Sequence, residues 1–164
     1  MAGHDPVAAE GDRRGRTLAA AVDRGTPRAV VLDTNLALDL LLFDDPATEH
    51  LALLLSAGRL RWIATCAMRS ELARVLDYPA VAAQLERRAD AATRVLQAFD
   101  AQVQSVDDPA SADLRCIDPD DQMFIDLAVE RGALLLSRDR ALLQLRAPLA
   151  ALGVEVRTAA TPAA

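Results

Sequence analysis

The sequence contains no lysine, because all 18 of its basic residues are arginine. This absence excludes several enzyme classes. A P-loop places a lysine on the phosphates, a Schiff-base enzyme needs an amine, and a response-regulator receiver, another acid-rich α/β domain, uses a lysine beside its aspartates. None of these sites can be built from this chain.

Aromatic, cysteine and histidine residues are scarce. Aromatic side chains make up only 3% of the chain, so leucine, valine, isoleucine and alanine must form the core. The two cysteines, Cys66 and Cys116, lie far apart and form no CxxC motif, which predicts reduced thiols rather than a zinc site. The only histidines, His4 and His50, are too few and too isolated to predict a Ser-His-Asp or Cys-His site.

Long apolar runs are also missing. No run reaches the roughly 18 residues of a membrane span, and the N-terminus lacks the apolar stretch of a secretory signal, so we expect a cytoplasmic protein. The length of 164 residues suits one domain. The net charge of −6 argues against a broad electrostatic nucleic-acid binder. It does not exclude a nuclease whose negative charge gathers in its site.

Short apolar runs alternate with amphipathic segments along most of the chain. This alternation predicts a three-layer α/β/α fold with a central, mostly parallel five-stranded sheet. We expect residues 1–27 to be a flexible extension, 28–158 the folded domain and 159–164 a tail. The expected strands are 29–32, 60–64, 102–106, 134–136 and 154–156. The expected helices are 36–42, 46–57, 65–76, 81–99, 119–131 and 140–145.

Four acidic residues lie where a predicted strand ends or near a predicted helix start: Asp33, Glu71, Asp121 and Asp139. In an open α/β sheet, ligands bind outside the carboxyl ends of the strands, so these acids can converge. Converging carboxylates repel one another unless a cation lies among them, and hard oxygen ligands favour Mg²⁺ or Mn²⁺. Taken singly, each has an ordinary alternative: an aspartate can cap a helix, and a helical glutamate is usually solvated.

Four motifs together resemble those of the PIN-domain nucleases, especially the bacterial toxin components of toxin–antitoxin pairs. The resemblance spans about residues 28–158. The motifs are Val31-Leu32-Asp33-Thr34-Asn35, Arg69-Ser70-Glu71-Leu72, Asp118-Pro119-Asp120-Asp121-Gln122-Met123-Phe124 and Leu136-Ser137-Arg138-Asp139. By position, the resemblance makes Asp33, Glu71, Asp121 and Asp139 the metal-binding acids. Asp118 is the main competitor of Asp121, and a shared role for Asp118 or Asp120 stays open.

The same resemblance implies a Mg²⁺- or Mn²⁺-dependent endoribonuclease with an RNA substrate, a possible antitoxin protein as partner and a homodimeric state. It implies that Asn35 and Ser137 support the acids or the attacking water. Three arginines flank the acids and are candidates for contacts with RNA phosphates: Arg69, Arg138 and Arg140.

Two other functions compete with this one. A PIN-like domain that binds RNA or protein without cleaving it would keep the same fold. A phosphatase of the haloacid dehalogenase type also has an aspartate after its first strand, but it needs a second aspartate where this chain has Asn35, and a lysine. For Trp62, the single tryptophan, both core packing and base stacking are open.

Overall fold

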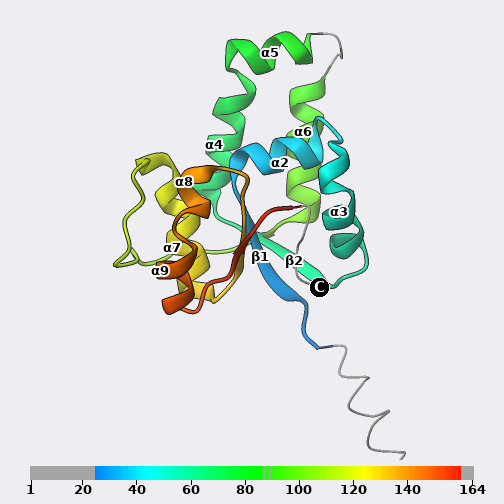
Figure 1. Ribbon diagram of the computed structural model, residues 1–164. Coiled ribbons are helices and arrows are strands. Elements are labelled where there is room, and N and C mark those ends of the chain that lie inside the picture. The colour runs from blue at the N-terminus through cyan, green and yellow to red at the C-terminus, as the bar shows by residue number, and fades with distance from the viewer. Residues whose placement is uncertain (1–24, 87, 89, 160–164) are drawn as a thin grey trace, which may run out of the picture.

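The computed structural model describes residues 25–86, 88 and 90–159, so most of the predicted N-terminal extension and nearly all of the tail lie outside the described residues. Five parallel strands form one sheet in the order β3-β2-β1-β4-β5 (Figure 1). The strands are β1 (Arg28–Leu32), β2 (Leu60–Ala64), β3 (Gln104–Ser105), β4 (Leu134–Leu136) and β5 (Val156–Arg157). The predicted five-stranded α/β/α fold is confirmed.

Continuous apolar runs form the two central strands. Val30, Val31 and all of Leu134–Leu136 are fully buried, as expected for strands covered on both faces. Leu32 of β1 pairs with Leu136 of β4, so these two strands end side by side.

Helices pack on both sides of the sheet. Helices α7, α8 and α9 lie together at the left of Figure 1, and α3 and α6 lie at the right. The hairpin of α4 and α6, joined through α5, extends beyond the carboxyl ends of the strands at the top of the view. The helices are α2 (Thr34–Leu41), α3 (Glu49–Ser56), α4 (Cys66–Leu76), α5 (Pro79–Leu85), α6 (Ala91–Gln102), α7 (Gln122–Arg131), α8 (Arg140–Leu143) and α9 (Arg146–Ala151), with the 3-10 turns η1 (Pro46–Thr48) and η2 (Pro119–Asp121).

Trp62 is a core residue. Its side chain is 2% exposed, and its ring meets that of Phe99 edge to face, with ring centroids 5.2 Å apart and an interplanar angle of 80°. This contact joins β2 to α6. The packing role is therefore confirmed, and a buried indole has no face left for a nucleic-acid base.

Sequence periodicity was wrong about one long helix. The segment predicted as a helix over 81–99 is broken into α5 and α6, and Asp90 adopts a left-handed conformation with φ of 62° just before α6. Four of the five residues between the two helices are charged, so no apolar face favours one continuous helix there. Helix α9 was not predicted; its Pro148 lies in the first turn, where no backbone N–H is needed.

The edge strands are shorter or shifted relative to the prediction. β3 keeps only Gln104–Ser105 because α6 continues to Gln102, and β5 is Val156–Arg157 rather than 154–156.

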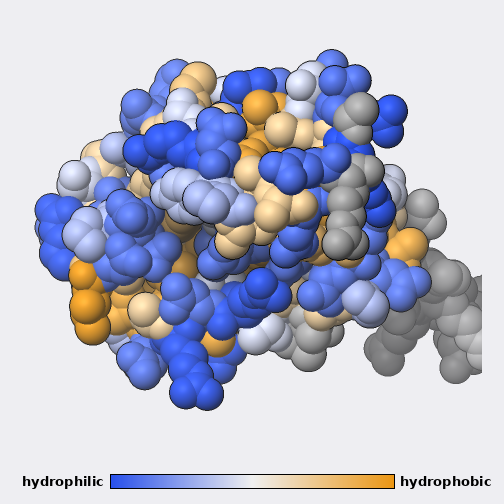
Figure 2. Space-filling view, turned by 90° about the horizontal axis from the view of Figure 1, so that it is seen from above, coloured by the Kyte–Doolittle hydropathy of each residue, from blue (hydrophilic) through white to orange (hydrophobic). Residues whose placement is uncertain are grey.

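Seen from above, the surface is mostly hydrophilic, with apolar residues in separate small patches (Figure 2). Among the described helices, none combines the length and apolarity that crossing a membrane requires.

Candidate active site

The sheet order creates a switch point beside β1, and we call the region outside the carboxyl ends of β1 and β4 the crevice. Strand β1 pairs with β2 on one side and with β4 on the other, so the chain turns in opposite directions from this strand. Such a switch point, at the carboxyl ends of the strands, is where open α/β sheets bind ligands. Asp33 follows β1, and Ser137 to Asp139 follow β4, so the crevice receives residues that are distant in sequence.

Asp33 is a buried carboxylate held by two hydrogen bonds. It is 4% exposed and caps α2, with Oδ1 accepting from the backbone N–H of Leu36 at 2.8 Å. Oδ2 accepts from the Ser137 hydroxyl. Burial raises the pKa of Asp33, the bonds from Ser137 and Leu36 lower it, and the neighbouring charge of Asp139 raises it. Asp33 is therefore kept in place by the fold but is harder to ionise than a solvated aspartate.

Ser137 joins the two acids that follow β1 and β4. Its hydroxyl is fully buried, donates to Asp33 Oδ2 and accepts from the backbone N–H of Asp139 at 3.0 Å. Asp139 in turn caps α8, with Oδ1 accepting from Ala141 N at 2.8 Å. The structure thus brings Asp33, Ser137 and Asp139 together, as the sequence predicted.

Asp121 completes the group of aspartates. It ends η2 at the start of α7, a helix that packs on β1 and β4. Burial, together with the negative charges of Asp118, Asp139, Asp33 and Asp120, raises its pKa from 3.8 to about 6. Its Oδ2 atom is buried and has no hydrogen-bond partner within the described part of the chain. A carboxylate oxygen in that state is suited to accept a cation.

Asp118 has a capping role that the sequence offered as one alternative. Its Oδ1 accepts from the backbone N–H of Asp120 at 3.0 Å at the start of η2. The side chain is exposed, and its charge acts on Asp121. Asp118 therefore lies at the rim of the group whose interior contains Asp33 and Asp121.

Glu71 is not joined to the aspartates in the same way. Its carboxylate, 14% exposed, pairs with Arg74 one turn along α4, and it is not among the charges that shift the pKa of Asp33 or Asp121. A role beside the aspartates would require Glu71 to exchange Arg74 for another cation. Its assignment as a metal ligand remains a prediction.

The arginines predicted to contact RNA differ in what already binds them. Arg69 is held by Asp100 through two atoms, with Nε–Oδ1 at 2.6 Å and Nη2–Oδ2 at 2.8 Å. Arg138 pairs with Asp39 at 2.8 Å, while Arg140 is exposed at the start of α8.

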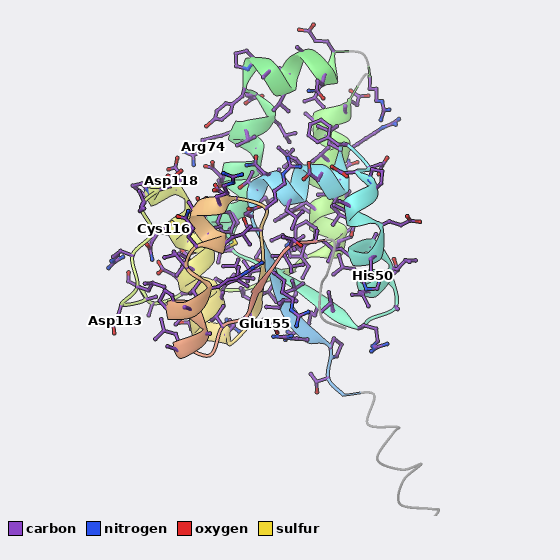
Figure 3. The ribbon with its side chains drawn as sticks, viewed as in Figure 1. His50, Arg74, Asp113, Cys116, Asp118 and Glu155 are labelled. Atoms are coloured by element: carbon purple, nitrogen blue, oxygen red, sulfur yellow. The ribbon has the colours of Figure 1, made fainter. Side chains whose placement is uncertain are left out.

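Asn35 and His50 lie outside the group of aspartates. Asn35, the predicted supporting amide, is exposed in the first turn of α2, and no hydrogen bond connects it to these acids among the described residues. His50 is on α3, on the side of the molecule away from Asp118 (Figure 3). His50 is therefore not positioned as a base for this site.

Two features beside the site were not found from the sequence. Asp39, on the buried face of α2, is the partner of Arg138; an aspartate in the middle of an apolar helical stripe was the available signal. The second is a row of polar side chains on α7 that binds the preceding loop. These side chains, spaced four residues apart along the helix, are Gln122, Asp126 and Glu130.

Gln122 makes two of the bonds that hold this loop and a third to Asp126 on its own helix. Its Oε1 accepts from Cys116 N at 2.7 Å, and its Nε2 donates to Leu114 O at 2.9 Å and to Asp126 Oδ1 at 2.8 Å. Because Gln122 directly follows Asp121, its hydrogen bonds to the loop also hold the loop next to Asp121. The four-residue spacing of Gln122, Asp126 and Glu130 could have indicated this row of polar side chains from the sequence.

The donor chemistry fits a hard divalent cation. The three aspartates interact electrostatically, and Asp121 offers a buried oxygen without a partner. Among residues 25–86, 88 and 90–159, no three His, Cys, Asp or Glu side chains converge closely enough to enclose an ion. Mg²⁺ commonly binds through one or two carboxylates and completes its coordination with water and substrate phosphate, which such an open arrangement suits.

Comparisons with known proteins identify a family and a similar fold. The model of the PIN domain matches residues 29–141, more than half of the chain. Among solved structures, the fold is similar to a chain in the crystal structure of VapBC2 from Rickettsia felis bound to a DNA fragment from their promoter. The TM-score is 0.56 at 13% identity, and the match covers 79% of this chain and 98% of that one. No curated protein matches the sequence.

Proposed function

The chain belongs to the PIN domain family, and from that premise we propose that it is a metal-dependent ribonuclease acting at the carboxyl ends of β1 and β4. PIN domains are generally nucleases. The observation that carries the proposal is the hydroxyl bridge from Ser137 to Asp33 and Asp139, with the unpartnered Oδ2 of Asp121 in the same group of charges.

The acids have different roles in this proposal. Asp33 and Asp121 would hold Mg²⁺ or Mn²⁺ directly, with Asp139 as the third ligand or as a ligand through water. Once bound, the ion supplies a phosphate contact, a water of lowered pKa and charge stabilisation for the departing oxygen. Ser137 orients Asp33 toward the crevice and fixes the backbone of Asp139. Glu71 and Asp118 stay candidates for further ligands, and Asn35 for a contact with water.

RNA is the proposed substrate and a protein antitoxin the proposed partner. The structural neighbour belongs to VapBC2 bound to a DNA fragment from their promoter, and the sequence motifs of this chain resemble those of the toxin components of toxin–antitoxin pairs. The overall net charge is negative, so binding to RNA must rest on local positive groups beside the acids. Arg138 and Arg140 are the candidates, whereas Arg69 is engaged by Asp100. A homodimer remains a prediction from the family resemblance.

Cleavage of a mixed-sequence single-stranded RNA tests the proposal. The wild type is incubated with RNA in Mg²⁺, in Mn²⁺ or in EDTA, and Asp33→Asn and Asp121→Asn are run beside it. These variants keep side-chain size but remove a ligand charge. Asp113→Asn, in an exposed part of the loop before α7, is the matched control, because it makes the same charge change outside the group.

We expect metal-dependent cleavage by the wild type and by Asp113→Asn, with a loss of at least about 100-fold in the two site variants. Inert wild-type protein with either metal would overturn the ribonuclease proposal. Equal cleavage by wild type and both site variants would overturn the site. RNA binding without turnover would instead support a non-cleaving PIN-like domain, whose plausibility rests on the open arrangement of the acids and the separate pairing of Glu71.

A further inference from the structure

Asp39 is a buried charge that the proposed chemistry does not use. It is 4% exposed and follows Leu36, Ala37 and Leu38, which are buried in the same turn of α2. A carboxylate at such a position loses its hydration and is retained only with a compensating partner. Its partner is the guanidinium of Arg138, whose Nη1 lies 2.8 Å from Asp39 Oδ2.

Arg138 comes from a segment that is already fixed at both sides. Ser137 bonds Asp33, and Asp139 caps α8, so the backbone at residue 138 is held between these two hydrogen-bonded residues. The side chain reaches from there to the last part of α2. A second carboxylate, Asp45, faces the same nitrogen at 3.9 Å. Two elements, α2 and the turn before η1, therefore define where the guanidinium lies.

Asp39 and Asp45 both pair with the same nitrogen of the Arg138 guanidinium. Both of its ion pairs among the described residues involve Nη1, and the side chain is 56% exposed. Among the described residues, no hydrogen bond or ion pair is seen at Nε or Nη2 of Arg138, and an edge of this kind can bind a phosphate through two parallel bonds. In Arg69 the same edge is occupied by Asp100.

We propose that Asp39 is a positioning residue that holds the guanidinium of Arg138 beside the carboxylates of Asp33 and Asp139, where its Nε–Nη2 edge binds a phosphate of the RNA backbone. This inference rests on the proposed ribonuclease function and deepens it. It separates the three candidate arginines: Arg138 is oriented for a phosphate, Arg69 is engaged, and Arg140 is not oriented by any ion pair among the described residues. A fixed cation beside the acids also offsets part of the repulsion that a phosphate meets there.

RNA binding measured apart from cleavage tests the inference. All variants are made in the Asp121→Asn background, which is expected not to cleave the RNA, and are measured in Mg²⁺. Fluorescence anisotropy of a labelled single-stranded RNA gives the dissociation constant at each of a series of salt concentrations. One phosphate contact contributes about 0.7 to the slope of log affinity against log salt for a single strand. The variants compared are Asp39→Ala, Asp39→Asn, Arg138→Gln and the double change of Asp39→Ala with Arg138→Gln.

We expect Arg138→Gln to weaken binding at least about fivefold and to lower the salt slope by about 0.7. Asp39→Ala should give a smaller loss in the same direction, because the guanidinium stays charged but is no longer held. Asp39→Asn should recover part of that loss through its amide oxygen. The double variant should match Arg138→Gln alone, since Asp39 acts through Arg138. Arg138→Lys should keep the slope but bind less tightly, because lysine has no two-pronged edge.

Arg131→Gln serves as the control for removal of an arginine. Arg131 ends α7, about 15 Å along the helix from the acids that precede it, and is exposed like Arg138. Thermal unfolding of each variant shows whether the fold is retained, and Asp39→Asn, which preserves volume, covers the case in which Asp39→Ala does not fold.

The results that overturn the inference differ from those that overturn the function. An unchanged salt slope in Arg138→Gln rejects the phosphate contact, and independent, additive losses from Asp39→Ala and Arg138→Gln reject the positioning role. A salt slope that falls as much in Arg131→Gln as in Arg138→Gln shows diffuse attraction and also rejects the phosphate contact. If the Asp121→Asn protein with Asp39 and Arg138 intact does not bind RNA, the inference is rejected. Any of these can occur while metal-dependent cleavage by the wild type stands.

Discussion

Removing the charge of Asp121 should stabilise the protein in the absence of metal. The pKa of Asp121 is raised from 3.8 to about 6 by burial and by the neighbouring aspartates. The folded state therefore binds this proton more tightly than the unfolded chain. Above pH 6, where the carboxylate is ionised in both states, its charge destabilises the fold. Asp121→Asn keeps the shape and removes that charge.

The size of the gain follows from the shift in pKa. A rise of about 2 units corresponds to about 3 kcal/mol, and partial exposure of the side chain reduces the expected value to about 2 kcal/mol. For a chain of this length each kcal/mol moves the melting temperature by about 2–4 °C. Asp121→Asn should therefore melt about 4–8 °C higher at pH 7.5 in EDTA. The gain should shrink as the pH falls through 6 and vanish near pH 4.

Thermal unfolding followed by circular dichroism, at several pH values in EDTA, measures this gain. Asp113→Asn provides the control, because the loss of an exposed charge should change the melting temperature by less than about 2 °C. Added Mg²⁺ should stabilise the wild type more than Asp121→Asn, since the ion binds the folded site. A variant that is no more stable at pH 7.5, or whose gain persists at pH 4, would refute the electrostatic account of this site.

Three further changes test other parts of the structure. Ser137→Ala should lower the free energy of unfolding by about 2 kcal/mol in urea titrations and raise the pKa of Asp33 further, because a buried charge loses its hydroxyl donor; no change in stability would contradict the bridge. Phe99→Ala should cost about 3–5 kcal/mol and shift the fluorescence of Trp62, the only tryptophan, so an unaltered spectrum would argue against their contact. Gln122→Ala should speed trypsin cleavage in the loop before α7 by about tenfold, while an unchanged rate would show that other bonds hold the loop.

The acids that follow strands could be predicted because their position is a property of local sequence. A buried run such as Leu134–Leu136 ends where polar residues begin, so Asp139 is placed at the edge of the sheet by the same pattern that defines the strand. Parallel pairing of β1 and β4 then brings Asp33 alongside. The convergence of these two acids required only the fold class.

Glu71 shows where such reasoning stops. It lies inside α4 rather than at a strand end, so its distance from the crevice depends on how the helix is turned about its axis and on the rotamer of a long side chain. Arg74 competes for it on the same helix. The pairing of Asp39 with Arg138 was equally out of reach, because it joins two segments through long-range packing that no local pattern encodes.

The hydroxyl of Ser137 and the carboxylate of Asp33 are separated by 104 residues of chain. During synthesis at about 5–20 residues per second, Asp33 therefore leaves the ribosome several seconds or more before its bridging partner. A growing chain or a proteolytic fragment that stops short of β4 has no completed crevice. On the proposed function, a protein that cleaves RNA is made beside the RNA that encodes it, and this order of assembly delays its activity until nearly the whole domain has been translated.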